Sequence, residues 1–99
     1  MPRARVSLVV LYTEHLEECR AFYAALGVPL VPEQHGTGPE HYAAELGKTV
    51  VELYPAAGRP TGRARLGLDV EAAETDPPLA PGRHLLTDPD GRTVDVLAH

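Results

Sequence analysis

The sequence has little of what several protein classes require. It holds one cysteine, Cys19, which excludes an intramolecular disulfide and a zinc site built from several cysteines. The longest apolar run, residues 8–11, is far shorter than the roughly 20 residues of a membrane-spanning helix, so we expect no membrane association. Basic residues are scarce, since nine Lys and Arg face fourteen Asp and Glu. Nucleic-acid binding rests on neutralising phosphates, so a net charge of −5 argues against a nucleic-acid-binding module.

What is present is ordinary for one small globular domain. The 99 residues are 43% hydrophobic and 23% charged, which excludes wholesale disorder. A domain of this size buries roughly two-thirds of its unfolded surface, so the core is small. Arginines stand at positions 3 and 5, but the apolar segment after them is too short for a secretion signal. We therefore predict a single cytoplasmic domain, residues 1–99.

Local patterns predict one helix and seven strands. Apolar residues spaced by three and four predict an amphipathic helix over 15–26, with Thr13 as its N-cap and Gly27 after its end. A Pro- and Gly-rich linker at 55–63 divides the chain, and the three prolines of residues 72–82 exclude a stable helix there. β-branched, alternating or turn-bounded segments predict strands at 6–12, 28–34, 41–46, 49–54, 65–71, 82–87 and 92–98.

Three segments resemble the vicinal oxygen chelate superfamily, also called the glyoxalase/bleomycin resistance/dioxygenase superfamily. They are AFYAALGVPLV at 21–31, VVELYP at 50–55 and DPDGRTVDVL at 88–97, and they occur in the order of the family. The resemblance implies an α+β, glyoxalase-like fold of paired βαβββ modules. The first module would span 1–55, and a shortened second module, lacking its helix, would span 64–99.

The resemblance also implies positions for a metal ion. In metal-dependent members, four ligands, mostly His and Glu, come from the first and last strands of the two modules. The corresponding residues of this chain are Ser7, Glu52, Arg65 and Asp95. Arginine offers no lone pair at neutral pH and repels a divalent ion. We therefore expect no cofactor at these positions; the alternative is a divalent metal ion held by Glu52, Asp95 and a histidine such as His41 or His84.

Strand alternation suggests which residues line a ligand cleft. It places Glu52, Tyr54 and Asp95 opposite the apolar faces of their strands, with Tyr12 and Tyr42 as further aromatic candidates. Two carboxylates could contact a ligand or hold a cation. The structural alternative is that Arg65 lies between Glu52 and Asp95 and neutralises them, because buried charges must be paired.

Residues 33–41 form the segment richest in functional side chains. It combines imidazoles, including His35 and His41, with carboxylates and flexible glycines, and histidine changes protonation near neutral pH. The alternative is an ordinary solvent-exposed turn, since the spacing of the two histidines matches no established metal motif. Cys19 lies on the buried stripe of the predicted helix beside acidic residues, which predicts an inert thiol.

These observations favour a metal-independent, small-molecule-binding protein similar to bleomycin resistance proteins. The negative net charge favours a cationic ligand. One alternative is a metal-dependent enzyme of lyase, isomerase or dioxygenase type with a degenerate site, and another is a dimerisation module with no ligand. Ser7, Glu52, Tyr54, Arg65, Asp95, His35 and His41 are the candidate ligand contacts, and whether the protein is catalytic stays open.

A homodimer is expected from the missing second helix. Without that helix, the apolar face of the second module should be uncovered, and monomeric proteins seldom expose apolar patches of several hundred Å². A symmetry-related copy would then cover the face. The residues concerned are Leu66, Leu68, Val70, Val94 and Val96.

Overall fold

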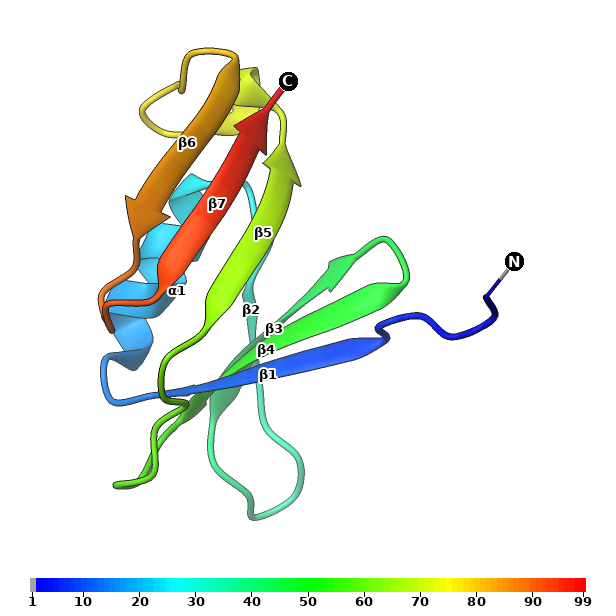
Figure 1. Ribbon diagram of the computed structural model, residues 1–99. Coiled ribbons are helices and arrows are strands. Elements are labelled where there is room, and N and C mark those ends of the chain that lie inside the picture. The colour runs from blue at the N-terminus through cyan, green and yellow to red at the C-terminus, as the bar shows by residue number, and fades with distance from the viewer. Residues whose placement is uncertain (1) are drawn as a thin grey trace.

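Two β-sheets and one α-helix form the computed structural model, which describes residues 2–99 (Figure 1). The elements in chain order are β1 (Leu8–Thr13), α1 (Leu16–Ala25), β2 (Val31–Glu33), β3 (His41–Leu46), β4 (Thr49–Pro55), β5 (Arg65–Val70), the 3₁₀ turn η1 (Ala72–Glu74), β6 (Gly82–Thr87) and β7 (Thr93–Ala98). The predicted helix and strands are all present, with bounds shifted by a few residues at most. Within residues 2–99 no helix has the length and apolar character needed to cross a bilayer.

The two sheets share one topology. The first has the order β1-β4-β3-β2, with β1 parallel to β4. The second has the order β5-β7-β6, with β5 parallel to β7. In each sheet the last strand thus lies between the first strand and the penultimate strand. The second sheet lacks a counterpart of β2, and η1 with the following prolines takes the place of a helix, which confirms the predicted fold class.

The turn between β3 and β4 determines which side chains share a face of the first sheet. Gly47 adopts φ +61 at the first turn position, a conformation that favours glycine, and Leu46 pairs with Thr49 across the turn. From this register Leu53 faces α1, whereas Glu52 lies on the opposite side. We call that opposite side the open face; its residues are Leu8, Val10, Tyr12, Val31, Glu33, His41, Ala43, Glu45, Val50, Glu52 and Tyr54.

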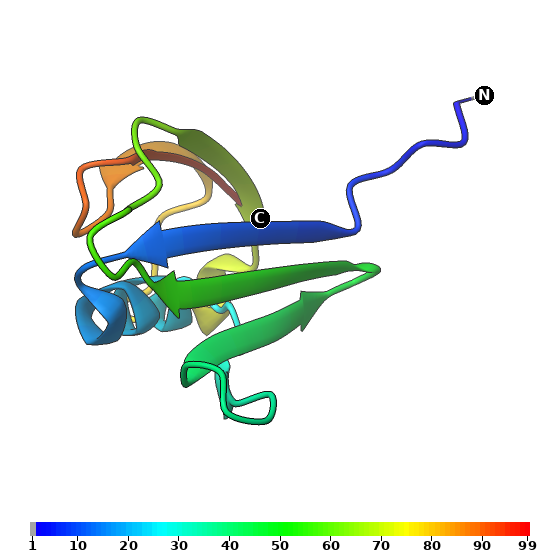
Figure 2. The same ribbon diagram turned by 90° about the horizontal axis from the view of Figure 1, so that it is seen from below.

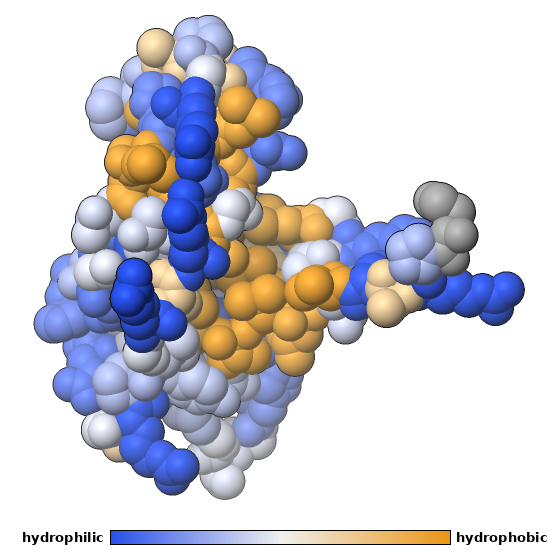
Figure 3. Space-filling view, in the orientation of Figure 1, coloured by the Kyte–Doolittle hydropathy of each residue, from blue (hydrophilic) through white to orange (hydrophobic). Residues whose placement is uncertain are grey.

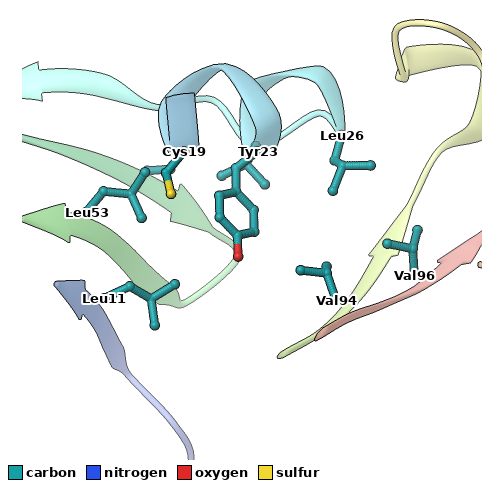
Figure 4. Close-up of a cluster of buried hydrophobic side chains, with 9 residues drawn as sticks. Leu11, Cys19, Tyr23, Leu26, Leu53, Val94 and Val96 are labelled. Atoms are coloured by element: carbon teal, nitrogen blue, oxygen red, sulfur yellow. The ribbon is translucent and has the colours of Figure 1, made fainter. Parts of the chain in front are cut away.

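Helix α1 covers both sheets. Its buried residues Cys19 and Tyr23, with Leu26 directly after its end, lie between Leu11 and Leu53 of the first sheet and Val94 and Val96 of the second (Figure 4). Val94 and Val96 are completely buried, each contributing about 1.5–3 kcal/mol.

The prediction that the apolar face of the second sheet is uncovered was therefore wrong. Leu66, Leu68 and Val70 are half-buried against the same core, and Leu79 from the proline-rich segment packs there too. Helix α1 covers the face of the second sheet that a second helix would otherwise cover. The apolar side chains that remain exposed lie elsewhere, chiefly Val6, Leu8, Tyr12, Val31, Leu85 and Leu97.

The two ends of α1 are fixed by different means. The N-cap position is His15 and not the predicted Thr13, because Thr13 is buried at the end of β1. The Thr13 hydroxyl nevertheless supports the turn, since it accepts a hydrogen bond from the His15 N–H at 2.9 Å. Gly27 follows the helix with φ +96, as predicted. The residues before β1 extend away from both sheets (Figure 2).

A buried ion pair joins the β6–β7 turn to α1. Asp88 accepts hydrogen bonds from the Tyr23 hydroxyl at 2.7 Å and from the Arg92 Nε at 2.8 Å. Its other oxygen accepts the backbone N–H groups of Asp90 and Arg92. Arg92 also donates to Asp90 at 2.8 Å. We call Tyr23, Asp88, Asp90 and Arg92 the turn cluster.

Candidate functional site

Strands β2, β3 and β4 bring four ionisable side chains together on the open face. In the strand register Glu33 lies opposite His41, and Ala43 lies opposite Glu52, so Glu52 is a near neighbour of His41 on the same face. His35 joins them from the loop after β2. One nitrogen or oxygen of each residue lies within 4.8 Å of those of the others. We call Glu33, His35, His41 and Glu52 the Glu–His cluster.

His41 is the fixed centre of this cluster. Its side chain is 1% exposed, and its ring stacks on Tyr54 with centroids 4.0 Å apart. The Nδ1 atom lies 3.1 Å from the Pro39 carbonyl oxygen, which can only accept, so Nδ1 carries a proton. The Nε2 atom lies 3.0 Å from Glu33 Oε1 and 3.6 Å from Glu52 Oε2. One imidazole nitrogen therefore faces two carboxylates.

His35 and Glu33 complete the cluster from its solvent side. The same Glu33 Oε1 atom lies 2.8 Å from His35 Nε2, so one oxygen lies between two imidazoles. The two imidazole rings are 5.2 Å apart, centroid to centroid. His35 is 68% exposed and Glu33 37% exposed, so these two side chains can move while His41 stays in place.

The charges of the cluster shift the protonation of its members. Hydrogen bonding from His41 holds the pKa of Glu33 below its usual value, although partial desolvation opposes this. Burial lowers the pKa of His41, but the hydrogen bond to Pro39 and the carboxylates of Glu33 and Glu52 outweigh it, so the pKa is raised. Burial and the nearby Glu52 raise the pKa of the Tyr54 hydroxyl. The cluster favours positive charge on or beside His41.

An open hollow of about 640 Å³ adjoins the cluster. Apolar side chains, among them Val31 and Val50, form one part of its wall, and Glu33, Glu45 and Glu52 form the other. The full lining is Pro29, Val31, Glu33, His35, Ala43, Ala44, Glu45, Val50 and Glu52. This lining includes three carboxylates and neither lysine nor arginine. On the side of the molecule seen in Figure 3, apolar side chains gather along β1 and beside the second sheet.

The remaining candidate contacts lie away from the cluster. Ser7 is exposed just before β1. Arg65 donates to Asp95 at 3.1 Å on the second sheet, and Arg83 donates to both oxygens of the same carboxylate, at 2.9 and 2.8 Å. These two arginines, Arg83 first, lower the pKa of Asp95 to about 2. The expectation that Arg65 neutralises both Glu52 and Asp95 was wrong, since Glu52 pairs with His41 instead.

The metal positions implied by the resemblance do not fit an ion. Asp95 already has two guanidinium partners, and Arg65 would bring positive charge to a divalent ion. The alternative ligand set of Glu52, Asp95 and His41 is not brought together either, because Glu52 and His41 cluster with Glu33 and His35, whereas Asp95 is paired with Arg65 and Arg83. His84 lies on the core side of β6, where its Nε2 is 2.6 Å from the Ala80 carbonyl oxygen.

The other residues singled out by sequence separate into two groups. Tyr12 and Tyr54 neighbour each other on the open face, with ring centroids 5.8 Å apart. Tyr42 points to the other side, where its hydroxyl donates to Glu17 of α1. Cys19 is buried on the core side of α1, as predicted, and burial raises the pKa of its thiol to about 11, which disfavours the reactive thiolate.

Sequence reasoning named the segment 33–41 but did not single out Glu33 as a site residue. The signal that would have found it is the strand register. Counting outward from the two-residue turn at Gly47 and Lys48 places Glu52 beside His41, and pairing β2 with β3 then places Glu33 opposite His41.

No family model matches this chain, and no curated protein sequence matches it significantly. Solved structures do match over nearly the whole chain. One is TnmS3, described as an antibiotic binding protein from Streptomyces sp. CB03234, with 22% identity, coverage of 99% of this chain and 98% of that one, and a TM-score of 0.62. This chain has the glyoxalase/bleomycin resistance/dioxygenase fold.

Two further structures show the range of proteins with this fold. A lactoylglutathione lyase from Agrobacterium tumefaciens is 19% identical, with 98% of this chain and 94% of that chain covered and a TM-score of 0.59. A glyoxalase/bleomycin resistance protein from Albidiferax ferrireducens T118 is 18% identical, with 94% and 97% covered and a TM-score of 0.58. Enzymes and binding proteins share the fold, so the fold leaves the activity open and the site must supply the argument.

Proposed function

We propose that this protein binds a small cationic molecule on the open face of its first sheet. The observation that carries the proposal is the hollow of about 640 Å³ beside the Glu–His cluster. Its volume lies within the roughly 300–1,000 Å³ usual for small-molecule sites. An apolar wall next to a few convergent polar groups is the usual composition of such sites.

The charge of the site selects the ligand. Glu33, Glu45 and Glu52 line the hollow, and the chain as a whole carries a net charge of −5. A positively charged group on the ligand would be attracted from a distance and would pair with these carboxylates on arrival. An apolar part of the same ligand would lie against Val31 and Val50.

Sequestration without chemical change is the simplest function for this site. The strand positions that hold a metal ion in metal-dependent members of the superfamily are Ser7, Glu52, Arg65 and Asp95 here, and the positive charge of Arg65 supports binding without the metal arrangement of those members. The description of TnmS3 as an antibiotic binding protein supports a binding role for a chain with this fold. A resistance-like role against a cationic compound is therefore our leading proposal.

A ligand screen tests the proposal. Purified protein is mixed with matched sets of cationic, neutral and anionic aromatic compounds, and thermal melting and quenching of tyrosine fluorescence are recorded. We expect cationic compounds alone to raise the melting temperature, and we expect Glu52→Gln to weaken their binding about tenfold, the effect of losing a charged pair of about 1.4 kcal/mol. Glu71→Gln, an exposed acid beyond the open face, should bind like the wild type. Equal binding of all three sets, or none, contradicts the proposal.

We also propose that the protein is a homodimer, through surfaces other than the one first expected. The second sheet's apolar face is covered by α1, but Val6 and Leu8 on or beside the first sheet are each more than half exposed, as is Leu85 on the second. A second copy placed over these residues would bury them. Sedimentation at micromolar concentration should give a dimer for the wild type and a monomer for Leu8→Glu. A monomeric wild type contradicts this proposal.

A further inference from the structure

We propose that the Glu–His cluster is a binding site for a divalent first-row transition metal ion such as Zn²⁺. Glu33, His35, His41 and Glu52 would be its ligands. The site shares only Glu52 with the strand positions that the superfamily resemblance implies, and it belongs to one sheet alone. A bound ion would neutralise Glu33 and Glu52 and so compete with the proposed cationic ligand; metal binding is therefore measured with no organic compound present.

The protonation of His41 is the first argument. Because Nδ1 donates its proton to the Pro39 carbonyl, Nε2 of the neutral ring presents a lone pair. That lone pair points toward Glu33 Oε1 at 3.0 Å and Glu52 Oε2 at 3.6 Å, both of which are acceptors too. Three electron-rich atoms facing one another at these distances require a cation between them. A second proton on His41 or a metal ion supplies it.

The charge balance favours the metal ion. The cluster holds two carboxylates and two imidazoles. Without a metal ion, the two carboxylates are balanced only if both His41 and His35 take up a second proton, whereas one divalent ion bound to neutral imidazoles balances both carboxylates. No lysine or arginine lines the adjoining hollow to supply the missing charge.

The four ligand atoms, and the contacts that hold His41 in place, are suitable for such an ion. Two imidazole nitrogens and two carboxylate oxygens are ligands that Zn²⁺ and its neighbours accept at about 2.0–2.2 Å. The four atoms lie within 4.8 Å of one another and must draw closer around an ion. The exposed side chains of Glu33 and His35 can make that movement. His41 is held by the Pro39 carbonyl and the Tyr54 ring, the kind of outer support that metal-bound histidines usually have.

Titration of metal-free protein tests the proposal. Chelator-treated protein near neutral pH is titrated with Zn²⁺ by calorimetry, and we expect one ion per chain. Glu33→Gln and His35→Ala should each weaken binding at least about tenfold, since even outer-shell changes at metal sites cost roughly 10–100-fold. Both side chains are partly or largely exposed, so neither variant should unfold the protein.

Two matched variants control for binding elsewhere. Glu71→Gln removes an exposed carboxylate away from the open face, and His15→Ala removes an exposed imidazole from the start of α1. Both should bind Zn²⁺ as the wild type does. Absorption of the Co²⁺-loaded protein should show the intense visible bands of a low-coordinate site, and these should vanish in Glu33→Gln. Wild-type protein that binds no ion, or cluster variants that bind as tightly as the controls, would overturn the proposal.

Discussion

The Glu–His cluster and the turn cluster both surround a buried ionisable side chain, but they differ in the hydrogen-bond partners that they give it. In the turn cluster, Asp88 has four donors, and Arg92 is paired with two carboxylates at 2.8 Å. Among the buried side-chain nitrogens and oxygens of residues 2–99, only Arg92 Nη1 lacks a partner. In the Glu–His cluster, one nitrogen of buried His41 faces two acceptors, and two members of the cluster are open to solvent.

This difference suggests a structural role for the turn cluster and a binding role for the Glu–His cluster. The turn cluster ties residues 88–92 to α1, and its donors and acceptors, apart from Arg92 Nη1, are matched within the chain itself. Such a network stabilises one arrangement and has little to offer a ligand. The Glu–His cluster has more acceptors than donors and lies beside a hollow, so it has binding capacity left for a cation. Three predictions follow from this contrast, and the first has the largest effect.

Replacing Asp88 by alanine should destabilise the fold strongly. The change leaves the Arg92 guanidinium, 3% exposed, without its main partner, and stranding a buried charge costs about 3–5 kcal/mol. A denaturant melt measures the loss. Asp69→Ala, at a carboxylate 76% exposed, is the control and should change stability by less than about 0.5 kcal/mol. Equal effects of the two variants would show that the turn cluster is not structural.

Acidification should weaken the turn cluster at a defined pH. Burial raises the pKa of Asp88, but hydrogen bonds from Tyr23 and the backbone, with the charge of Arg92, outweigh it and hold the pKa below its usual value. The folded state therefore binds this proton less readily than the unfolded state. The resulting stability is present above about pH 4 and is lost as the pH falls through the folded pKa.

Denaturant melts between about pH 5 and pH 2 check this expectation. The wild type should lose stability faster than Asp88→Asn over that range, because the variant cannot titrate at this position. Asp95, with its pKa of about 2, titrates in both proteins and cancels in the difference. Parallel profiles for the two proteins would contradict the assignment.

Replacing Arg65 by methionine should have the smallest effect. Arg65 is 60% exposed, and Arg83 still binds both oxygens of Asp95 after the change. Exposed ion pairs contribute about 0–1 kcal/mol, so we expect a loss below about 0.5 kcal/mol. A loss of several kcal/mol would mean that Arg65 reaches a buried carboxylate such as Glu52.

Local sequence patterns predicted the elements because their causes are local. The spacing of Leu16, Cys19 and Tyr23 predicts the helix, and the turn at Gly47 predicts the β3–β4 hairpin. The same patterns predicted that Glu52 and Tyr54 share a face opposite Leu53, which the register confirms.

What sequence reasoning missed depends on contacts between distant segments. Nothing near Val94 or Val96 indicates that α1 will cover them, because α1 lies some seventy residues earlier in the chain. The partners of Arg65 were predicted from strand alternation alone. Alternation shows on which face of its strand a side chain lies, but not which side chains of the other sheet are near it. His41 and Glu52 belong to neighbouring strands, so their contact follows from register, which the hairpin turn does encode.

Nitrogen NMR of the histidine rings tests the central claim most directly. Long-range ¹H–¹⁵N spectra of metal-free protein report the protonation of each ring nitrogen, and Zn²⁺ is then added in steps. We predict that the Nε2 signals of His35 and His41 shift and saturate at one ion per chain, while His15, His84 and His99 stay unchanged. If His41 keeps a proton on Nε2 and its signal does not move, the Glu–His cluster is a closed ion network like the turn cluster, and the account is contradicted.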